Sequence, residues 1–245
     1  MADPRRFRED SAGDLLRLLD ASERERFGRF RHEADARAYM LAHAMRRAGV
    51  AKALGVSPGE IVFAHDDKGK PLLEGPHRND IFFSHSRRRE GVACVVTRAG
   101  AVGIDVESAR AETDGDGSGF SLLAPYMELP DAARRAADMG PDAHRQFRCY
   151  WTALEAYWKA QGTGLATSNP RVQCTRNPGG EFEVAIAGNP PSQRANVFFV
   201  PSAHELTVAV ALQLSNESIA PGHKSFRCQV LHCNSSMEIY NSSMT

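Results

Sequence analysis

The chain has 245 residues, 42% of them hydrophobic, and its 30 basic and 30 acidic side chains leave no formal net charge at pH 7. This length is sufficient for one large domain or two small ones. The charge balance gives no reason to expect nucleic acid or an anionic membrane as a partner. No apolar run could span a bilayer, and a charged sequence follows Met1 where a signal peptide would be apolar, so we expect a cytoplasmic protein.

The first part of the chain, residues 5–60, is expected to be helical. Four leucines, at positions 15, 16, 18 and 19, mark a first short helix. Ser22 is expected to cap a second helix, with Glu25 as its capping-box partner. An alanine-rich stretch from Asp35 through Leu54 predicts a long third helix, which Gly55 ends.

Short strands are expected next, at 61–64, 81–83, 91–97 and 103–107. Because short turns connect them, they are expected to form an antiparallel sheet. A stretch rich in Gly, Asp and Ser at 109–119 indicates a boundary between two lobes, and a helical run follows at 132–139. Four further strands, separated by Pro/Gly/Asn turns, are expected at 172–175, 181–186, 195–200 and 206–214.

The stretch from Phe147 to Leu165 predicts an amphipathic helix. Its large apolar side chains recur at the spacing of one helix face: Phe147, Tyr150, Trp151, Leu154 and Trp158. Glu155 and Lys159 lie one turn apart on a flanking face, and glycines at 162 and 164 end the helix. Taken alone, Glu155 and Lys159 are an ordinary surface ion pair worth about 0.2–0.5 kcal/mol.

The segment Gly103-Ile104-Asp105-Val106-Glu107 adds two carboxylates. Since alternate residues of a strand share a face, Asp105 and Glu107 project to the same side. Two adjacent carboxylates repel each other, which is tolerable if both are solvated and useful if a hard cation such as Mg²⁺ lies between their oxygens. With Glu155 as a third oxygen donor and Lys159 as a fixed positive charge, the set is suited to a metal-bound pyrophosphate.

Four motifs together resemble those of the 4'-phosphopantetheinyl transferases, in particular their longer, two-lobed, surfactin-synthetase-type branch. The first two are GIDVE at 103–107 and, some forty residues later, WTxxEAxxKAxGxGL from Trp151 to Leu165. The other two, Gly69-Lys70-Pro71 and Ser84-His85-Ser86, stand upstream in the order and rough spacing of the family. Each motif is weak alone, but four in this order are specific, and the resemblance runs from about Phe27 to about Leu214.

The resemblance implies an enzyme that transfers the 4'-phosphopantetheine arm of coenzyme A to a serine hydroxyl of an apo acyl or peptidyl carrier protein and releases 3',5'-ADP. It implies Mg²⁺ held by Asp105, Glu107 and Glu155, with Lys159 on the leaving diphosphate. Asp105, Glu155 and Lys159 are then the catalytic residues. Glu155 would be either the base that takes the serine proton or the group that orients a metal-bound water for that task.

The resemblance also implies which residues bind coenzyme A. Arg26 and Arg29 are expected at its 3'-phosphate, although the ordinary interpretation of such a basic cluster is a solvated surface. Lys70 and Pro71 are expected beside the adenine. Ser84 and His85 are expected beside a phosphate, to which a charged histidine ring is suited.

The expected fold class is α+β, with two similar lobes related by a pseudo-two-fold axis, each an antiparallel sheet packed against a long helix. Residues 1–110 would form an N-terminal lobe that holds the nucleotide and carries the strand with the metal carboxylates. Residues 120–215 would form a C-terminal lobe with the helix of Glu155 and Lys159, and we expect the protein to be a monomer. Residues 216–245, with little alanine and with Asn/Ser clusters, predict a disordered tail or a cloning remnant.

Two other classes of protein stay open: a non-catalytic module of the same fold that binds coenzyme A or a carrier protein, and a metal-dependent pyrophosphate hydrolase. The dense carboxylate set disfavours the binding module. Two positions depart from the family pattern, since Leu154 stands where lysine is frequent and Phe82 where asparagine is frequent. The first removes one positive charge near the phosphates. The pathway served, whether fatty acid, polyketide, nonribosomal peptide or lysine synthesis, is not determined by the sequence.

Overall fold

The structure of the protein is a computed structural model. It describes residues 1–4, 12–108, 122–128, 141–166, 168–177, 181–190, 193–202, 206–214, 228–233 and 239–244, with backbone only at 141–142 and in the last two ranges. The joint expected at 109–119 and the helical run expected at 132–139 lie outside these residues. Among the helices in the described ranges, none is both long and apolar enough to cross a membrane.

The chain divides into two compact units: unit 1, residues 1–100 with 220–245, and unit 2, residues 101–219. The sequence predicted the boundary between residues 110 and 120, but the structure has it at residue 100. The reason is that β5 (Gly100–Ser108) pairs with β10 (Leu206–Leu214) in the sheet of unit 2. The strand with Asp105 and Glu107 therefore belongs to the same unit as Glu155 and Lys159, and each unit has its own buried core.

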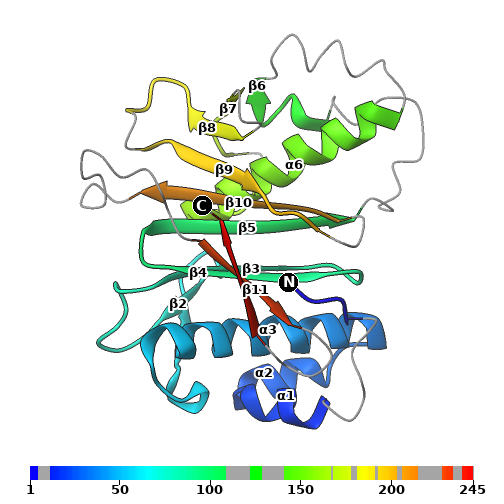
Figure 1. Cartoon of the computed structure of the whole chain (residues 1–245), viewed down its shortest axis with the longest axis vertical. Helices are drawn as coiled ribbons and strands as arrows, with labels where there is room; N and C mark the ends of the chain where they lie inside the picture. Colours follow the sequence, from blue (N-terminus) through cyan, green and yellow to red (C-terminus); the bar gives the residue numbers. More distant parts are fainter. Residues whose placement is uncertain are drawn as a thin grey trace. The chain divides into compact units, whose positions relative to one another are not determined.

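Unit 1 contains three helices: α1 (Ala12–Leu18), α2 (Ala21–Phe27) and α3 (Glu33–Leu54). Helix α3 packs against α1 and α2 on one side and against the strands β3 and β4 on the other (Figure 1). It ends at Gly55, whose φ of 74° is accessible to glycine at low cost, as the sequence predicted. The cap of α2 is Asp20 and not Ser22, because Asp20 Oδ1 accepts from the Glu23 amide (2.8 Å) while Glu23 Oε2 accepts from the Asp20 amide (2.9 Å).

The strands of unit 1 form two antiparallel sheets. A short 3-10 turn, η3 (Pro58–Glu60), precedes the hairpin of β1 (Phe63–His65) and β2 (Pro71–Leu73). The second sheet has the order β12-β11-β4-β3, with β3 (Phe82–Arg87) and β4 (Val92–Thr97) next to each other. Strand β3 continues through Ser84-His85-Ser86, so this motif lies within a strand.

Two C-terminal segments form strands in the region for which the sequence predicted either a disordered tail or a cloning remnant. They contain β11 (Cys228–Cys233) and β12 (Ile239–Met244), which pair with each other. Strand β11 also pairs with β4, Gln229 opposite Val96 and Val230 opposite Val95. The physical reason is that β4 would otherwise offer unpaired backbone groups along one edge, which another strand can satisfy.

Unit 2 contains one six-stranded sheet, in the order β5-β10-β9-β8-β7-β6. The strands not yet introduced are β6 (Met127–Glu128), β7 (Val172–Arg176), β8 (Phe182–Ile186) and β9 (Ala195–Phe199). The pairs from β7 to β10 are antiparallel, while β6 and β7 are parallel. The expected α+β class is confirmed, since in each unit a long helix packs against largely antiparallel strands.

The long helix of unit 2, α6 (Pro141–Gln161), packs against β8, β9 and β10 (Figure 1). The apolar stripe predicted from its sequence is buried at Phe147, Tyr150, Leu154 and Trp158, and Trp151 packs against the same core while staying partly exposed. Burying this stripe fixes the rotation of the helix about its axis. The flanking face with Glu155 and Lys159 is thereby directed away from the core.

Candidate active site

Strand β5 and helix α6 come into direct backbone contact at Gly103. A Cβ atom on Gly103 would lie 2.0 Å from the carbonyl oxygen of Ala156 and 2.5 Å from the amide nitrogen of Ala160, distances that no real side chain has. Only glycine lets the strand approach the helix this closely. Because alternate residues of a strand share a face, Asp105 and Glu107 project toward the same side as this contact.

Lys159 of α6 connects two of the predicted carboxylates. Its Nζ lies 2.6 Å from Oδ1 of Asp105 and 4.0 Å from Oε2 of Glu155. The Asp105 side chain is only 4% exposed, whereas those of Glu155 and Lys159 are 25% and 28% exposed. A buried carboxylate needs a compensating charge, and the ammonium of Lys159 supplies it. The structure thus brings Asp105, Glu155 and Lys159 together, as the sequence predicted for the catalytic set.

Glu107, the remaining predicted metal ligand, is buried two residues further along β5. Within the described ranges, no three His, Cys, Asp or Glu side chains lie close enough together to hold a metal ion. The donor set still has the chemistry that Mg²⁺ requires, because it offers hard carboxylate oxygens, and a cation, the Lys159 ammonium, is already shared by two of them. The magnesium site therefore stays a prediction about these three carboxylates.

A pocket of about 680 Å³ lies in unit 1. Its lining is rich in arginine, histidine and aromatic side chains and includes three carboxylates. The lining residues are Asp20, Ser22, Glu23, Glu25, Arg26, Arg29, Phe30, Tyr39, His43, Arg46, Phe63, His65 and Arg87. The pocket therefore includes both arginines for which the sequence predicted contact with the 3'-phosphate. Aromatic side chains beside arginines provide both a stacking surface and anion-binding groups.

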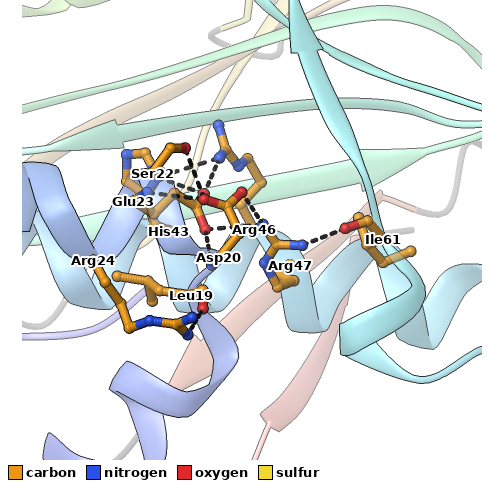
Figure 2. Close-up of polar contacts among 9 residues, drawn as sticks. All are labelled: Leu19, Asp20, Ser22, Glu23, Arg24, His43, Arg46, Arg47 and Ile61. Carbon is orange, nitrogen blue, oxygen red and sulfur yellow. Dashed lines mark hydrogen bonds and ion pairs between the residues drawn. The ribbon is translucent and has the colours of Figure 1, made fainter.

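One wall of this pocket is a buried network of ion pairs centred on Glu23 (Figure 2). Glu23 Oε1 lies 2.5 Å from the guanidinium of Arg46 and 2.9 Å from Nδ1 of His43. Glu23 Oε2 lies 2.9 Å from the guanidinium of Arg47, which also pairs with Asp20 at 2.8 Å. Both arginines are 2% exposed, so the network fixes the wall of the pocket rather than forming a mobile surface.

The network shifts the titration of its members. Burial alone would raise the pKa of Glu23, but hydrogen bonds from His43, the Asp20 amide and Arg47 outweigh it and hold that pKa well below its ordinary value of 4.5. Burial lowers the pKa of His43 below its ordinary value of 6.5, although the hydrogen bond to Glu23 opposes the shift. Glu23 is thus ionised and His43 is favoured in its neutral form.

The other residues with a predicted role in coenzyme A binding also belong to unit 1. Ser84 is buried in β3, and the ring of His85 lies 5.3 Å, centroid to centroid, from His43 of the pocket. Lys70 and Pro71 follow a turn in which Asp66 Oδ1 accepts from the Lys70 amide at 2.7 Å. Burial lowers the pKa of Lys70, with Asp66 opposing. The hairpin therefore holds this lysine against the protein surface.

Comparison with known proteins identifies the family of both parts of the chain. Residues 8–96 match the family model described as "4'-phosphopantetheinyl transferase, N-terminal", and residues 101–211 match that described as "4'-phosphopantetheinyl transferase superfamily". The chain is 30% identical to the 4'-phosphopantetheinyl transferase HetI of Nostoc sp. over 188 residues, which span 76% of this chain and 72% of HetI. The chain belongs to the 4'-phosphopantetheinyl transferases.

Two further transferases show the same relation. A 4'-phosphopantetheinyl transferase of Bacillus subtilis is 28% identical over 64% of this chain and 67% of its own length. The 4'-phosphopantetheinyl transferase Sfp of Bacillus subtilis strain 168 is 20% identical over 80% of this chain and 84% of its own length. The two family matches meet between residues 96 and 101, where the structure divides its units. The chain is therefore an enzyme of the 4'-phosphopantetheinyl transferase family with both parts of the fold.

Several residues of this transferase that shape the site were not predicted from the sequence. The sequence indicates Gly103 only as part of a motif and does not predict the backbone contact that requires glycine at this position. The Glu23 network was missed, although Asp20 and Glu23 have capping-box spacing and two adjacent arginines, Arg46 and Arg47, interrupt the alanine-rich helix α3. Charged residues at otherwise apolar positions of a helix are the signal that could have indicated this network.

Proposed function

We propose that this enzyme transfers the 4'-phosphopantetheine arm of coenzyme A to a serine hydroxyl of an apo carrier protein, with Mg²⁺, and releases 3',5'-ADP. The main support is the cluster at the contact of β5 and α6. There a buried aspartate and a partly exposed glutamate share one ammonium in a chain of this family. A protein that only binds coenzyme A has no need for a buried carboxylate beside a second one.

Mg²⁺ would be held by Asp105, Glu107 and Glu155. When bound, it would supply positive charge to the pyrophosphate oxygens and so favour departure of the leaving group. Lys159 would add a second positive charge from the protein itself. Lys159 Nζ donates to Asp105 Oδ1 at 2.6 Å, which compensates the charge of the carboxylate and keeps its side chain in place.

The reaction needs a proton acceptor, because a serine hydroxyl is a weak nucleophile until its proton is removed. Glu155 is our candidate, since it is the most exposed of the three carboxylates and therefore the most accessible to a partner protein. The serine oxygen forms a bond to the phosphorus that bears pantetheine, and the bond from that phosphorus to the leaving oxygen of 3',5'-ADP breaks. Glu155 takes the proton directly or orients a water that does so, and Lys159 offsets the charge that develops on the leaving phosphate.

Coenzyme A would bind through the residues of unit 1 described above. Arg26 and Arg29 line the pocket and would contact the 3'-phosphate, while His85 would donate to a phosphate next to Ser84. Lys70 and Pro71 would contact the adenine side. Guanidinium groups are suited to phosphate because they donate two parallel hydrogen bonds to its oxygens.

The direct test uses the purified chain with Mg²⁺, coenzyme A and a panel of apo carrier proteins from fatty acid, polyketide and nonribosomal peptide synthesis. We expect at least one carrier to gain the mass of a phosphopantetheine arm on its serine, as measured by intact-protein mass spectrometry. A serine-to-alanine carrier is the control and should keep its mass. The panel also identifies the carrier class served.

Two other outcomes would overturn the proposal. If every carrier keeps its mass although coenzyme A binds, the chain is a binding module. If 3',5'-ADP is released without any modified carrier, the chain is a hydrolase that uses water in place of serine. Asp105→Asn keeps the shape of the side chain and removes its charge. If the activity belongs to this chain and not to a contaminant, product formation should fall in Asp105→Asn purified in the same way as the wild type.

A further inference from the structure

A partly exposed stripe of side chains runs along helix α6, from the proposed active site toward the start of the helix. Its residues are Arg148, Trp151, Glu155 and Lys159. They are spaced by three, four and four residues, so their side chains share one face of the helix. Because each residue of a helix adds about 1.5 Å, Trp151 lies about 6 Å and Arg148 about 10 Å from Glu155 along the axis. The stripe therefore continues the proposed active site on the same element.

Trp151 is the large aromatic side chain of this stripe. Its ring stacks on that of Phe147, with 5.9 Å between the centroids, and meets the ring of Tyr126 edge-on at 6.5 Å. These contacts hold the indole against the core of unit 2, although part of it stays exposed. A fixed and partly exposed indole offers apolar contact area at a low cost in conformational entropy, which is why tryptophan often dominates the binding energy of protein interfaces.

Two arginines precede this ring in the helix, Arg148 and the exposed Arg145. In the part of the chain that the structure describes, neither guanidinium has a carboxylate within ion-pair distance. The Nε atom of Arg148 is buried and has no hydrogen-bond partner among those residues. Burial raises the pKa of the neighbouring Cys149 thiol, while Arg145, Arg148 and Arg176 oppose the shift and no carboxylate contributes to it. The charge of this end of the stripe is therefore positive and uncompensated.

A protein substrate has to cover part of this stripe in order to deliver its serine to Glu155. A stable interface buries about 800 Å² on each partner, which corresponds to a disc of about 16 Å radius. Trp151 and Arg148 lie within that radius of Glu155, and Arg145, ten residues before Glu155, lies about 15 Å from it along the axis. Since this surface is positive, the segment of a partner that complements it is acidic.

We propose that Arg145, Arg148 and Trp151 form a docking surface for an acidic segment of the carrier protein next to its serine. This inference rests on the proposed function, which supplies the carrier and the position of the serine. Carboxylates of the carrier pair with the two guanidinium groups, and an apolar side chain of the carrier packs on the indole. The surface therefore favours carriers whose acidic residues lie about 10–15 Å from the serine, and it contributes to the choice of carrier.

The kinetic test uses the carrier that the wild type modifies fastest. In the double variant Arg145→Gln/Arg148→Gln we expect the KM for the carrier to rise about tenfold, while kcat and the KM for coenzyme A stay within about twofold. In the wild type the KM for the carrier should rise between about 50 mM and about 500 mM NaCl, and in the double variant it should rise less, because salt screens the lost contacts. Arg78→Gln is the matched control. Arg78 is an exposed arginine of unit 1 with no ion pair to any described residue, and its replacement should leave all three constants unchanged.

A change in the carrier separates direct contact from a structural effect. Replacing the acidic residues near the carrier's serine by their amides should raise the KM of the wild type similarly, but should add little in the double variant. Because the Nε atom of Arg148 is buried, Arg145→Gln alone is a second variant that changes only an exposed side chain, and its KM for the carrier should rise about threefold. Circular dichroism and the melting temperature show whether each variant is folded. An unchanged KM in both variants, an equal rise in Arg78→Gln, or full additivity with the carrier changes would overturn the proposal.

Docking can also be measured without catalysis, in the absence of coenzyme A. The chain has two tryptophans, and Trp158 is only 3% exposed, so quenching of tryptophan fluorescence by acrylamide reports mainly on Trp151. An apo carrier that lacks tryptophan should protect Trp151 from the quencher in the wild type, and protect it much less in the double variant.

The outcome is separable from that of the proposed function. If no carrier is modified but the most acidic carrier of the panel protects Trp151, and this protection is lost in the double variant, the catalytic assignment fails and the docking surface stands. If carriers are modified but neither the KM nor the quenching depends on the two arginines, the docking surface is wrong and the transferase stands.

Discussion

Lys159 is a residue whose partners come from two elements, Asp105 from strand β5 and Glu155 from its own helix. The helical pair could be predicted from spacing alone, because residues four apart in a helix are neighbours. The 2.6 Å contact with Asp105 could not, since 54 residues separate the two positions. The resemblance to a known family placed these residues in one set, and the structure provides the physical contact.

At this scale we predict that Glu155→Gln lowers turnover by well over tenfold. The amide keeps the size of the side chain but removes the charge that would take the serine proton or hold the metal. The measurement is the rate of holo-carrier formation at saturating coenzyme A, with circular dichroism to show that the fold is retained.

Glu128→Gln is the matched control for this prediction. Glu128 is an exposed glutamate of β6, at the opposite edge of the same sheet from β5, and its replacement should leave turnover unchanged. Turnover at the wild-type level in Glu155→Gln would mean that the catalytic set is wrongly assigned.

Two elements, β5 and α6, owe their close approach to Gly103. The sequence predicted both elements, and the side of the strand on which the carboxylates lie, from periodicity. It did not predict which face of α6 the strand contacts, because that depends on how the small side chains of Ala156 and Ala160 fit against a glycine.

At the scale of elements, Gly103→Ala is expected to lower the free energy of unfolding by about 3 kcal/mol, at the upper end of the cost of overpacking. The added methyl group would meet backbone atoms, which move less easily than a side chain. Urea unfolding measures the change, and activity should fall with it because β5 carries Asp105.

Gly13→Ala serves as the control substitution. A Cβ at Gly13, in α1, would meet no atom within 4 Å, so this change should be neutral or stabilise by up to about 1 kcal/mol. Equal effects of the two substitutions would contradict the close contact at Gly103.

The whole molecule has no formal net charge at pH 7, but it contains buried groups whose protonation in acid lowers the free energy of unfolding. His43 has a folded pKa below its ordinary 6.5, so the unfolded chain binds this proton first and stability falls as the pH drops below about 6.5. Glu23 has a folded pKa below its ordinary 4.5, so a second loss follows below about 4.5. Both shifts have the same sign, and both groups belong to unit 1.

We therefore predict that the midpoint of urea unfolding falls in two steps as the pH is lowered from about 8, the first below about pH 6.5 and the second below about pH 4.5. In His43→Gln the first step should be absent, since the amide can still contact Glu23 but does not titrate. Asp35, in the exposed pair with Arg89, offers a comparison, because Asp35→Asn should leave the first step unchanged. A midpoint that is constant from about pH 7.5 to about pH 5.5 in the wild type would contradict the prediction.

The sequence alone determined most of the secondary structure and the residues of the proposed chemistry. The apolar stripe of α6, the end of α3 at Gly55 and the strand at 206–214 follow from local periodicity and glycine conformation, which depend on neighbours in the chain. The tertiary structure decided what distant residues do together. It showed that β5 pairs with β10, that β11 covers the edge of β4, and that Arg26 and Arg87 meet on Tyr39. Pairing and burial of this kind depend on the packing of whole elements, which no local pattern specifies.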